Sequence, residues 1–370
     1  MSYRLGIDVG GTNTDAVVLD EAGNPIAKFK TPTTEDVTTG ILRALDGVLA
    51  GGAVSAEAIR HAMLGTTHCT NTIVERRSLA RIGLLRLGAP ATLAIRPLVS
   101  WPADLLQEVQ PQVFVVRGGH EFDGREISPL DEAAVREAAR RMRDAGVEAV
   151  AVSAVFSPVN PDHERRAAEI LREEFGPAFP ITLSHEIGSI GLLERENASA
   201  LNAAVVKVAR TAFTAFQEAL RSRGIRARLY ITQNDGTLMS VEYALRYPVL
   251  TIASGPANSL KGAAYLSGLK DAAVVDVGGT TTDVGILTNG FPRESAVAVE
   301  IGGVRTNFRM PDLISIGLGG GSLVAERDGY IQIGPRSVGY RLEQEAFVFG
   351  GRTLTATDIA VASGLLKLGD

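Results

Sequence analysis

Apolar and polar residues alternate along the first 31 positions, in three short runs separated by turn residues. The runs read YRLGIDV, TDAVVLD and IAKFKT, and the segments GGTN and EAGNP lie between them. Alternation with a period of two, broken by glycine-rich turns, predicts an antiparallel meander of three strands. A helix is predicted directly afterwards at 35–50, because Leu42, Leu45 and Leu49 recur there with helical spacing.

The same plan returns far along the chain, up to about residue 298. The segment VVDVGGTTTDVGILT contains two predicted strands around a Gly-Gly-Thr turn, and Asn289-Gly290 marks a second turn before another short strand. Seven of the eight residues from Asp8 to Asp15 recur from Asp276 to Asp283. Chance is a poor explanation for a match of that density, so the sequence predicts a duplicated three-stranded unit.

Helical and strand patterns alternate between the two copies. Helices are predicted at 130–146, 161–175 and 191–223, and strands at 147–156, 179–185, 228–235 and 249–255. Alternating helices and strands between two meanders indicate an α/β architecture with a duplicated lobe. Because 370 residues exceed one ordinary core, we expect an N-terminal lobe over 1–185, a C-terminal lobe over 186–370 and a ligand cleft between them.

Composition narrows the class of protein. Hydrophobic residues make up 45% of the chain, mean hydropathy is +0.12 and the formal net charge is −5, with no dense block of Lys and Arg. We therefore expect a globular protein with no nucleic-acid partner. The first residues, MSYRLGID, lack an apolar signal segment, and no apolar run reaches the ~18 residues of a membrane span. The predicted location is cytoplasmic, with no membrane contact.

The two Gly-Gly-Thr turns carry the candidate chemistry. Glycines expose consecutive backbone N–H groups that can cradle phosphate oxygens, and Asp8 and Asp276 end the strands just before the turns. Carboxylates beside phosphate imply an intervening divalent cation, so we expect Mg²⁺ held by Asp8 and Asp276. An ordinary tight hairpin is the better explanation of one copy alone, but the duplication favours a ligand. The predicted phosphate contacts are Gly10, Gly11, Thr12, Asn13, Gly278, Gly279, Thr280 and Thr281.

This paired-hairpin pattern resembles the actin-like ATPase superfamily, whose duplicated ribonuclease H-like fold grips Mg-ATP in a cleft between two lobes. Six further segments occur in an order typical of one family within it. They are GTTHCTNTIVERR (65–77), GGHEFDGREISPLDE (118–132), SHEIGSIGLLERENASALNAAV (184–205), QNDGTL (233–238), IASGPANSLKGA (252–263) and DLISIGLGGGSL (312–323). Together they resemble the hydantoinase A / 5-oxoprolinase family over essentially the whole chain.

The resemblance implies a hydrolase that uses ATP to open a cyclic amide such as a hydantoin or 5-oxoproline. Phosphorylation of the carbonyl oxygen makes the amide carbon more electrophilic, and this step depends on positioning and charge neutralisation. Asp276 or Asp283 could orient the attacking group or act as base, with Asp276 favoured near the metal and Asp283 in a structural role. Asp8, Asp276 and Asp283 are thus the candidate catalytic residues. The resemblance also implies a second hydantoinase subunit as a partner, and a homodimer is expected on base rates.

The segment GTTHCTN gathers hydroxyl, imidazole and amide side chains in one short stretch. Thr66, Thr67 and Asn71 are candidates to contact a polar substrate ring or the γ-phosphate. The alternative is a capped turn before a helix at 71–78, with Thr70 as its N-cap.

Four other features have competing interpretations. Cys69 is the single cysteine, and we expect it to be a small buried residue rather than a nucleophile, because no base is evident beside it. His68 stands where the family commonly has a small apolar residue, so no catalytic role is assigned to it. Residues 194–197 either line the cleft or form a solvated helix face. Residues 254–256 either face the ligand or form a plain strand-to-helix turn.

The last third of the chain departs from the family pattern. Gly319 and Gly320 are candidate nucleotide contacts, although the family carries a further glycine-rich segment that would lie beyond Asp370. Ile314 stands where a histidine is common in the family. We therefore expect an incomplete C-terminal lobe.

Two other functions fit the same hairpins. A small-molecule kinase of the actin-like superfamily would release a phosphorylated product. A non-catalytic nucleotide-binding subunit would hydrolyse ATP slowly, without stimulation by a cyclic amide. Phosphate release with and without hydantoin or 5-oxoproline separates both from a ring-opening enzyme.

Overall fold

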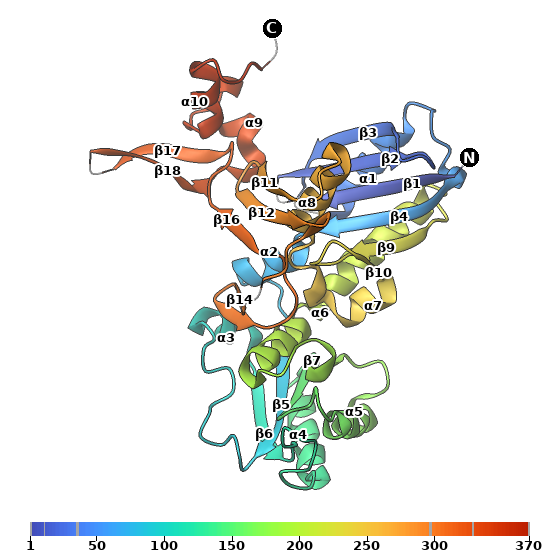
Figure 1. The fold of residues 1–370 in the computed structure, drawn as a ribbon, viewed down its shortest axis with the longest axis vertical. Coiled ribbons are helices and arrows are strands. Elements are labelled where there is room, and N and C mark those ends of the chain that lie inside the picture. Colours follow the sequence, from blue (N-terminus) through green and yellow to red (C-terminus); the bar gives the residue numbers. More distant parts are fainter. Residues whose placement is uncertain (1, 11, 35–36, 296–297, 328, 369–370) are drawn as a thin grey trace.

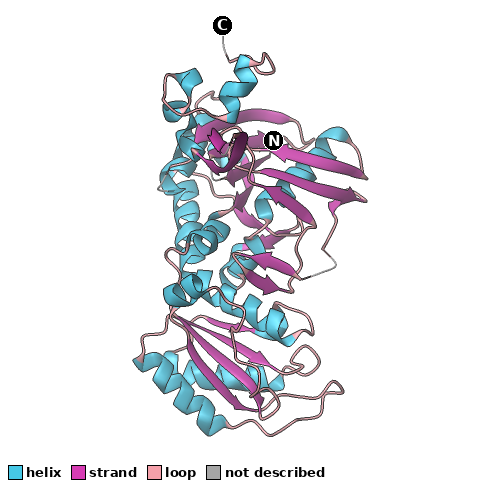
Figure 2. Ribbon diagram, turned by 90° about the vertical axis from the view of Figure 1, so that its left-hand side faces the viewer, coloured by secondary structure: helices cyan, strands magenta, loops and turns pink. Residues whose placement is uncertain are grey.

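The computed structural model describes residues 2–10, 12–34, 37–295, 298–327 and 329–368. Figure 1 shows three main β-sheets: two lie side by side at the upper end of the molecule and the third lies at the lower end. A long helix, α6 (Leu192–Ser222), runs between the upper sheets and the lower one. Figure 2 shows the same stacking from the side, with helices against the faces of the lower sheet.

The first sheet has six strands in the order β10-β9-β4-β1-β2-β3. Its strands are β1 (Tyr3–Val9), β2 (Asn13–Leu19), β3 (Pro25–Pro32), β4 (Ile59–Thr66), β9 (Arg228–Thr232) and β10 (Leu238–Ser240). The first three form the predicted antiparallel meander, and β4 pairs in parallel with the other side of β1. Alternate residues such as Leu5, Ile7 and Val18 are buried beneath helix α1 (Val37–Leu49), which matches the helix predicted there.

The second sheet repeats the hairpin of the first. Strands β11 (Ala272–Val277) and β12 (Thr282–Thr288) are antiparallel, as β1 and β2 are. The short strand predicted after the Asn289-Gly290 turn is present, and a second strand also pairs with β12. Strand β13 (Phe291–Pro292) pairs with the end of β12, whereas β16 (Leu313–Ile316) pairs with its start. Helix α8 (Ser254–Ser267) packs against this sheet and buries Leu260.

The third sheet is wholly parallel, in the order β6-β5-β7-β8. Its strands are β5 (Ile82–Ala89), β6 (Gln112–Arg117), β7 (Ala149–Ala154) and β8 (Ile181–Leu183). Every residue of β5 and β7 is buried, as parallel strands covered on both faces require. Helices α4 (Glu132–Asp144) and α5 (Asp162–Phe175) cover one face and α6 covers the other.

Helix α6 buries charged as well as apolar side chains. Arg195 and Glu196 are 0% exposed. The carboxylate of Glu196 accepts two hydrogen bonds from Arg86, at 2.5 and 2.7 Å, and Asn197 accepts one from the indole N–H of Trp101 at 2.9 Å. Both interpretations of this segment were therefore wrong for its last three residues, which neither line a cleft nor face solvent. Arg195 and Glu196 join α6 to β7 and β5 of the third sheet through paired, fully desolvated groups.

Two local predictions were also wrong. The apolar run at 249–255 forms a short turn, η3 (Pro248–Thr251), followed by the start of α8, because a short buried apolar run suits a helix as well as a strand. The helix predicted at 71–78 is α2 (His68–Glu75), whose N-cap residue is Thr67. Thr70 lies inside this helix, where its hydroxyl donates to the carbonyl oxygen of Ile252 at 2.5 Å.

The remaining elements extend the lobes. They are η1 (Ala56–Ala58), α3 (Ala103–Val109), η2 (Ser184–Glu186), α7 (Val241–Arg246), β14 (Val299–Ile301), β15 (Val304–Thr306), β17 (Ser322–Arg327), β18 (Tyr330–Ser337), η4 (Gly339–Arg341), α9 (Leu342–Glu345), η5 (Phe347–Phe349) and α10 (Ala356–Ala362). The division into lobes 1–185 and 186–370 stays a prediction, and β4 and β9 pair strands from both ranges in one sheet. Within the described residues, no helix combines the length and apolar character needed to cross a membrane.

Candidate functional site

The two hairpins have the same strand register and the same turn hydrogen bond as well as similar sequences. Asp8 pairs with Asp15 in the first, and Asp276 pairs with Asp283 in the second. Each turn is closed from its first glycine: Gly10 donates its N–H to Asn13 at 3.0 Å, and Gly278 donates to Thr281 at 2.9 Å. A Cβ on either glycine would lie 3.2 Å from that same carbonyl oxygen. The repeat seen in the sequence is therefore a repeat of one backbone conformation.

The tips of the two hairpins meet. The hydroxyl oxygens of Thr12 and Thr280 lie 3.5 Å apart, although 268 positions separate them along the chain. A Cβ on Gly279 would lie 2.9 Å from the Thr12 hydroxyl, so glycine allows the approach. Gly11, which we predicted as a phosphate contact, lies outside the described residues. The fold thus brings the predicted phosphate-binding turns together from its two ends.

Asp8 carries an unpaired oxygen beside these turns. Its Oδ1 atom is buried and has no hydrogen-bond partner among the described residues. Burial and then the charge of Asp15 raise the pKa of Asp8, the Asn258 side chain lowers it, and the charge of Asp276 raises it again. The neighbouring strand β4 lies close to this carboxylate. A Cβ on its residue Gly65 would lie 2.5 Å from the same Oδ1. A buried carboxylate oxygen with no donor fits a divalent cation as its missing partner.

The acidic residues of the second hairpin lie in a more open setting. Asp276 is half-buried, and its charge acts on Asp8 across the gap between the hairpins. Burial raises the pKa of Asp283, while a hydrogen bond with Ser315 of β16 lowers it and the charge of Asp276 raises it. Asp8 and Asp276 are the residues predicted to hold the cation. Their role remains a prediction.

The glycine-rich loop 317–322 supports the second hairpin. Gly320 donates its N–H to the carbonyl oxygen of Gly278 at 3.0 Å, and Gly321 donates to that of Gly279 at 2.7 Å. A Cβ on Gly319 would lie 2.6 Å from the oxygen of Gly278. Gly319 and Gly320 thus pack backbone to backbone against the turn, and a direct contact with nucleotide stays a prediction.

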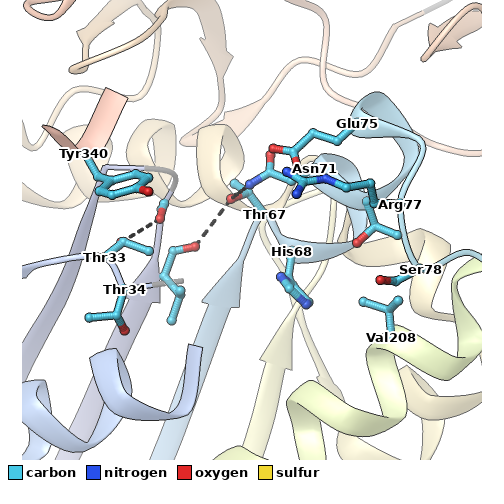
Figure 3. A pocket seen from close by; sticks show the side chains of 13 residues that line it. Thr33, Thr34, Thr67, His68, Asn71, Glu75, Arg77, Ser78, Val208 and Tyr340 are labelled. Atoms are coloured by element: carbon cyan, nitrogen blue, oxygen red, sulfur yellow. Dashed lines mark hydrogen bonds and ion pairs between the residues drawn. The ribbon is translucent and has the colours of Figure 1, made fainter. Parts of the chain in front are cut away.

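A pocket of about 470 Å³ opens beside the first hairpin. Figure 3 shows His68 at its centre, between Thr34 on one side and Ser78 and Val208 on the other. The pocket is lined by Val9, Gly10, Thr33, Thr34, Thr67, His68, Asn71, Thr72, Glu75, Arg77, Ser78, Val208 and Tyr340.

Two of the three predicted substrate contacts reach this pocket. Thr67 and Asn71 line it, and the Asn71 amide lies 3.5 Å from the Thr67 hydroxyl. Thr66 does not, because it is 2% exposed and its hydroxyl accepts the backbone N–H of His68 at 3.1 Å. Sequence reasoning missed the role of Glu75 as a lining residue. Helical spacing was the available signal, since positions 68, 71, 72 and 75 share one face of a helix.

The pocket contains the ionisable side chains of His68, Glu75 and Arg77. Burial lowers the pKa of His68, and the charge of Glu75 raises it. Glu75 also pairs with Arg77 at 2.5 Å at an exposed position. Cys69 points away into the core, where burial raises its pKa to about 11, so it is a buried residue as expected and no thiolate nucleophile.

The segment 254–256 begins helix α8 and follows the turn η3 rather than a strand, and a ligand contact there stays a prediction. The Ser254 hydroxyl donates to the carbonyl oxygen of Thr66 at 3.1 Å and is itself fully buried. Asn258, one turn later, interacts with the Asp8 carboxylate. The start of α8 therefore holds the end of β4 against the first hairpin.

Comparison with known proteins identifies the family. The family model "Hydantoinase/oxoprolinase N-terminal region" matches residues 4–175, and "Hydantoinase/oxoprolinase" matches residues 195–369. The acetophenone carboxylase gamma subunit of Aromatoleum aromaticum is 30% identical, covering 98% of this chain and 53% of its own length. Caprolactamase subunit alpha of Pseudomonas jessenii is 31% identical, covering 99% of this chain and 55% of its own length.

The fold has a close counterpart as well. The crystal structure of the ATP-dependent caprolactamase from Pseudomonas jessenii matches with a TM-score of 0.77 at 27% identity, over 99% of this chain and 55% of that chain. This likeness confirms the predicted two-lobed α/β fold. The chain spans about half the length of the curated relatives it matches. Since family models cover both of its halves, the chain belongs to the hydantoinase/oxoprolinase family.

Proposed function

We propose that this chain is the nucleotide-binding part of an ATP-dependent hydrolase that opens a cyclic amide. The observation that carries the proposal is the pair of hairpins in one register, whose tips meet at Thr12 and Thr280 beside the unpartnered oxygen of Asp8. A relative of 31% identity is named caprolactamase subunit alpha, which supports this reaction class. The two family models support it over both halves of the chain.

The hairpins supply the groups that bind nucleotide and metal. When bound, Mg-ATP supplies the phosphoryl group that activates the amide carbonyl and the cation that offsets phosphate charge. The backbone N–H groups of the two turns bind phosphate oxygens, and the Thr12 and Thr280 hydroxyls add donors. Asp8 and Asp276 hold the cation. Because both turns are fixed by their own hydrogen bonds, they would hold the phosphates with little reorganisation.

The pocket beside the first hairpin is the proposed site for the cyclic amide. Its volume of about 470 Å³ suits a small ring, and it reaches the hairpin at Gly10. Thr67 and Asn71 offer a hydroxyl and an amide to orient the ring carbonyl and N–H. Since burial keeps the pKa of His68 low, its imidazole is neutral there and has both a donor and an acceptor nitrogen.

Asp283 is the proposed group that orients the attacking water. Burial raises its pKa, which makes it a stronger base than an exposed carboxylate, and Ser315 holds its orientation. A second subunit as partner fits the names of the two relatives above, both of which are subunits. We also propose a homodimer of the chain.

A second candidate is ATP-dependent carboxylation of a ketone. The observation that favours it is the relative of 30% identity named acetophenone carboxylase gamma subunit, which covers 98% of this chain. Both reactions start from a polarised carbonyl, so the same hairpins and pocket serve either.

Phosphate release tests the proposal directly. The chain is incubated with Mg-ATP alone, with caprolactam, hydantoin or 5-oxoproline, and with acetophenone plus bicarbonate. Stimulation by a cyclic amide together with a ring-opened product is the expected result. Stimulation by acetophenone and bicarbonate alone would replace it with the second candidate. A persistent phosphorylated product would indicate a kinase, and ATP binding without any stimulation would indicate a non-catalytic subunit.

A further inference from the structure

Three side chains with metal-binding atoms gather at the carboxyl ends of the third sheet, apart from the hairpins and the pocket. His120 and Glu126 belong to the loop that follows β6, and His163 is the second residue of α5. One ligand atom from each lies within 4.8 Å of the other two. Crevices at the carboxyl ends of parallel strands are the usual ligand sites of such sheets.

The loop that carries this cluster is held in one shape. Ile127 donates its N–H to the carbonyl oxygen of Gly119 at 3.0 Å, and Glu121 donates to that of Arg125 at 2.7 Å. The backbone of His120 bridges to Glu126 across the loop and donates to Val155 at 3.1 Å. Hydrogen bonds therefore fix the loop from Gly119 to Ile127, which favours a site over a chance encounter of side chains.

His120 is the unsatisfied member of the cluster. Its side chain is 1% exposed, and its Nδ1 atom is buried without a hydrogen-bond partner among the described residues. The rings of His120 and His163 lie 4.3 Å apart between centroids. A neutral imidazole keeps one nitrogen lone pair that can bind a metal ion. A buried polar atom without a partner costs free energy, and a bound cation would remove that cost.

His163 already points a nitrogen at the carboxylate. Its Nδ1 accepts the backbone N–H of Gly119 at 2.9 Å, so its proton is on Nε2, which lies 3.1 Å from Oε1 of Glu126. A cation between Nε2 and Glu126 would take the place of that proton.

We propose that His120, Glu126 and His163 bind one divalent transition-metal ion, with Zn²⁺ as the chemical type, and that water completes the coordination. Two imidazoles and one carboxylate suit Zn²⁺ and its neighbours, whereas Mg²⁺ and Ca²⁺ take oxygen ligands. Glu126 is exposed, which leaves the site open to solvent on one side. The ion ties the loop after β6 to α5.

Binding requires a change of tautomer. When His163 coordinates through Nε2, its single ring proton moves to Nδ1, where the N–H of Gly119 now points. The peptide between Gly118 and Gly119 must then rotate, so that its carbonyl oxygen accepts the Nδ1 proton, as outer partners of metal-bound histidines commonly do. Both residues are glycines with φ of +147° and +95°, so this rotation meets no Cβ.

The test uses the purified chain, stripped with chelator and titrated with Co²⁺ and with Zn²⁺ alone. We expect one Co²⁺ per chain with the visible absorption of a tetrahedral site, displacement by Zn²⁺ and a higher Tm in Zn²⁺. His120→Ala and His163→Ala should each weaken binding by more than roughly 100-fold. Glu126→Gln, which changes an exposed side chain and leaves folding intact, should weaken it by about 10-fold or more.

His61→Ala is the matched control. His61 also has a buried, unpartnered Nδ1 but stands outside the cluster, so its loss should leave metal binding unchanged. Ring ¹⁵N shifts of His163 should report the move of its proton from Nε2 to Nδ1 on metal binding. Absence of Co²⁺ binding at 1:1 in the parent chain, or unchanged binding in Glu126→Gln and His120→Ala, would overturn the proposal.

Discussion

The two hairpins share sequence, register and turn geometry, yet they lie in different surroundings. The first lies inside a sheet of six strands, with β4 along the outer side of β1 and the Asp8 oxygen buried. In the second hairpin, β11 lies at the edge of its sheet and pairs with β12. Val275 and Val277 of β11 are 60% and 67% exposed. Asp276 is half-buried.

This difference shows what a repeated motif does and does not specify. Glycine placement and strand alternation fix the turn itself, because those interactions are local. Burial and electrostatics come from the packing of distant segments, and they differ between the copies. The first hairpin is therefore expected to be the more rigid grip with the more perturbed carboxylate, and the second the more open one.

The largest expected effect tests whether both hairpins hold the cation. Asp8→Ala and Asp276→Ala should each weaken Mg²⁺-dependent ATP binding by at least about 10–100-fold, because each removes a charged metal ligand. Calorimetric titration with ATP, in Mg²⁺ and in EDTA, measures this. Asp144→Ala, at the exposed end of α4, serves as the control and should bind as the parent does. A loss in Asp8→Ala alone would show that the second hairpin is not a metal site.

The next prediction concerns the support of the second hairpin. Gly319→Ala should lower the free energy of unfolding by about 1–3 kcal/mol, because its Cβ would lie 2.6 Å from the Gly278 oxygen in tightly packed backbone. Gly262→Ala is the matched control within helix α8, where a Cβ meets nothing within 4 Å. It should raise the free energy of unfolding by about 0.5–1 kcal/mol. Urea unfolding measures both, and equal effects would contradict the packing argument.

The third prediction addresses the buried carboxylate of the first hairpin. Burial and the charge of Asp15 raise the pKa of Asp8 above its ordinary value of 3.8, so the folded chain binds this proton more tightly than the unfolded chain does. Its contribution to stability is then fully present below pH 3.8 and is lost as pH rises through the folded pKa. Asp8→Asn should therefore raise the free energy of unfolding at pH 7, by about 1 kcal/mol, and flatten its pH dependence above pH 4.

Asp15→Asn sharpens this test. Asp15 pairs with Lys30 at 2.8 Å at the surface, so its loss should change the free energy of unfolding by less than about 0.5 kcal/mol. Denaturation curves for both variants between pH 4 and pH 8 give the comparison. Lower stability of Asp8→Asn at pH 7 would mean that the carboxylate is satisfied in the folded chain.

The smallest effect is at the point where the hairpins touch. The hydroxyl oxygens of Thr12 and Thr280 lie 3.5 Å apart, at the long end of a hydrogen bond. A double-mutant cycle with Thr12→Val and Thr280→Val should give a coupling energy of about 0.5 kcal/mol or less in the absence of nucleotide. A coupling above about 1 kcal/mol would show that the tips, and not the surrounding elements, hold the hairpins together.

Much of the fold could be predicted from sequence because its signals are local. The meander, the helix at 191–223 and the duplicated turn follow from periodicity and glycine placement. The candidate site could be predicted in part: the two predicted turns lie together and Thr67 lines the pocket, whereas Tyr340 and Val208 come from segments far from α2 in the chain. No short-range pattern indicates that they line the same pocket.

The predictions that were wrong, at 194–197 and 249–255, share one physical cause. The segment at 194–197 is charged, which normally indicates solvent, yet Arg195 and Glu196 are buried because Arg86 and the neighbouring carbonyl groups satisfy them. The run at 249–255 is apolar enough for a strand, yet it is buried as a turn and a helix start. In both places tertiary partners override the local preference, and one sequence does not reveal those partners.

The position of helix α6 between two sheets affects how the molecule unfolds. Its 31 residues pack against the core of the first sheet and against the third sheet, and Glu196 pairs with Arg86 of β5. Neither layer can lose its order without exposing one flank of this helix to water. The two layers should therefore melt in a single cooperative transition, and a protease should cut the intact chain in neither layer before both are lost.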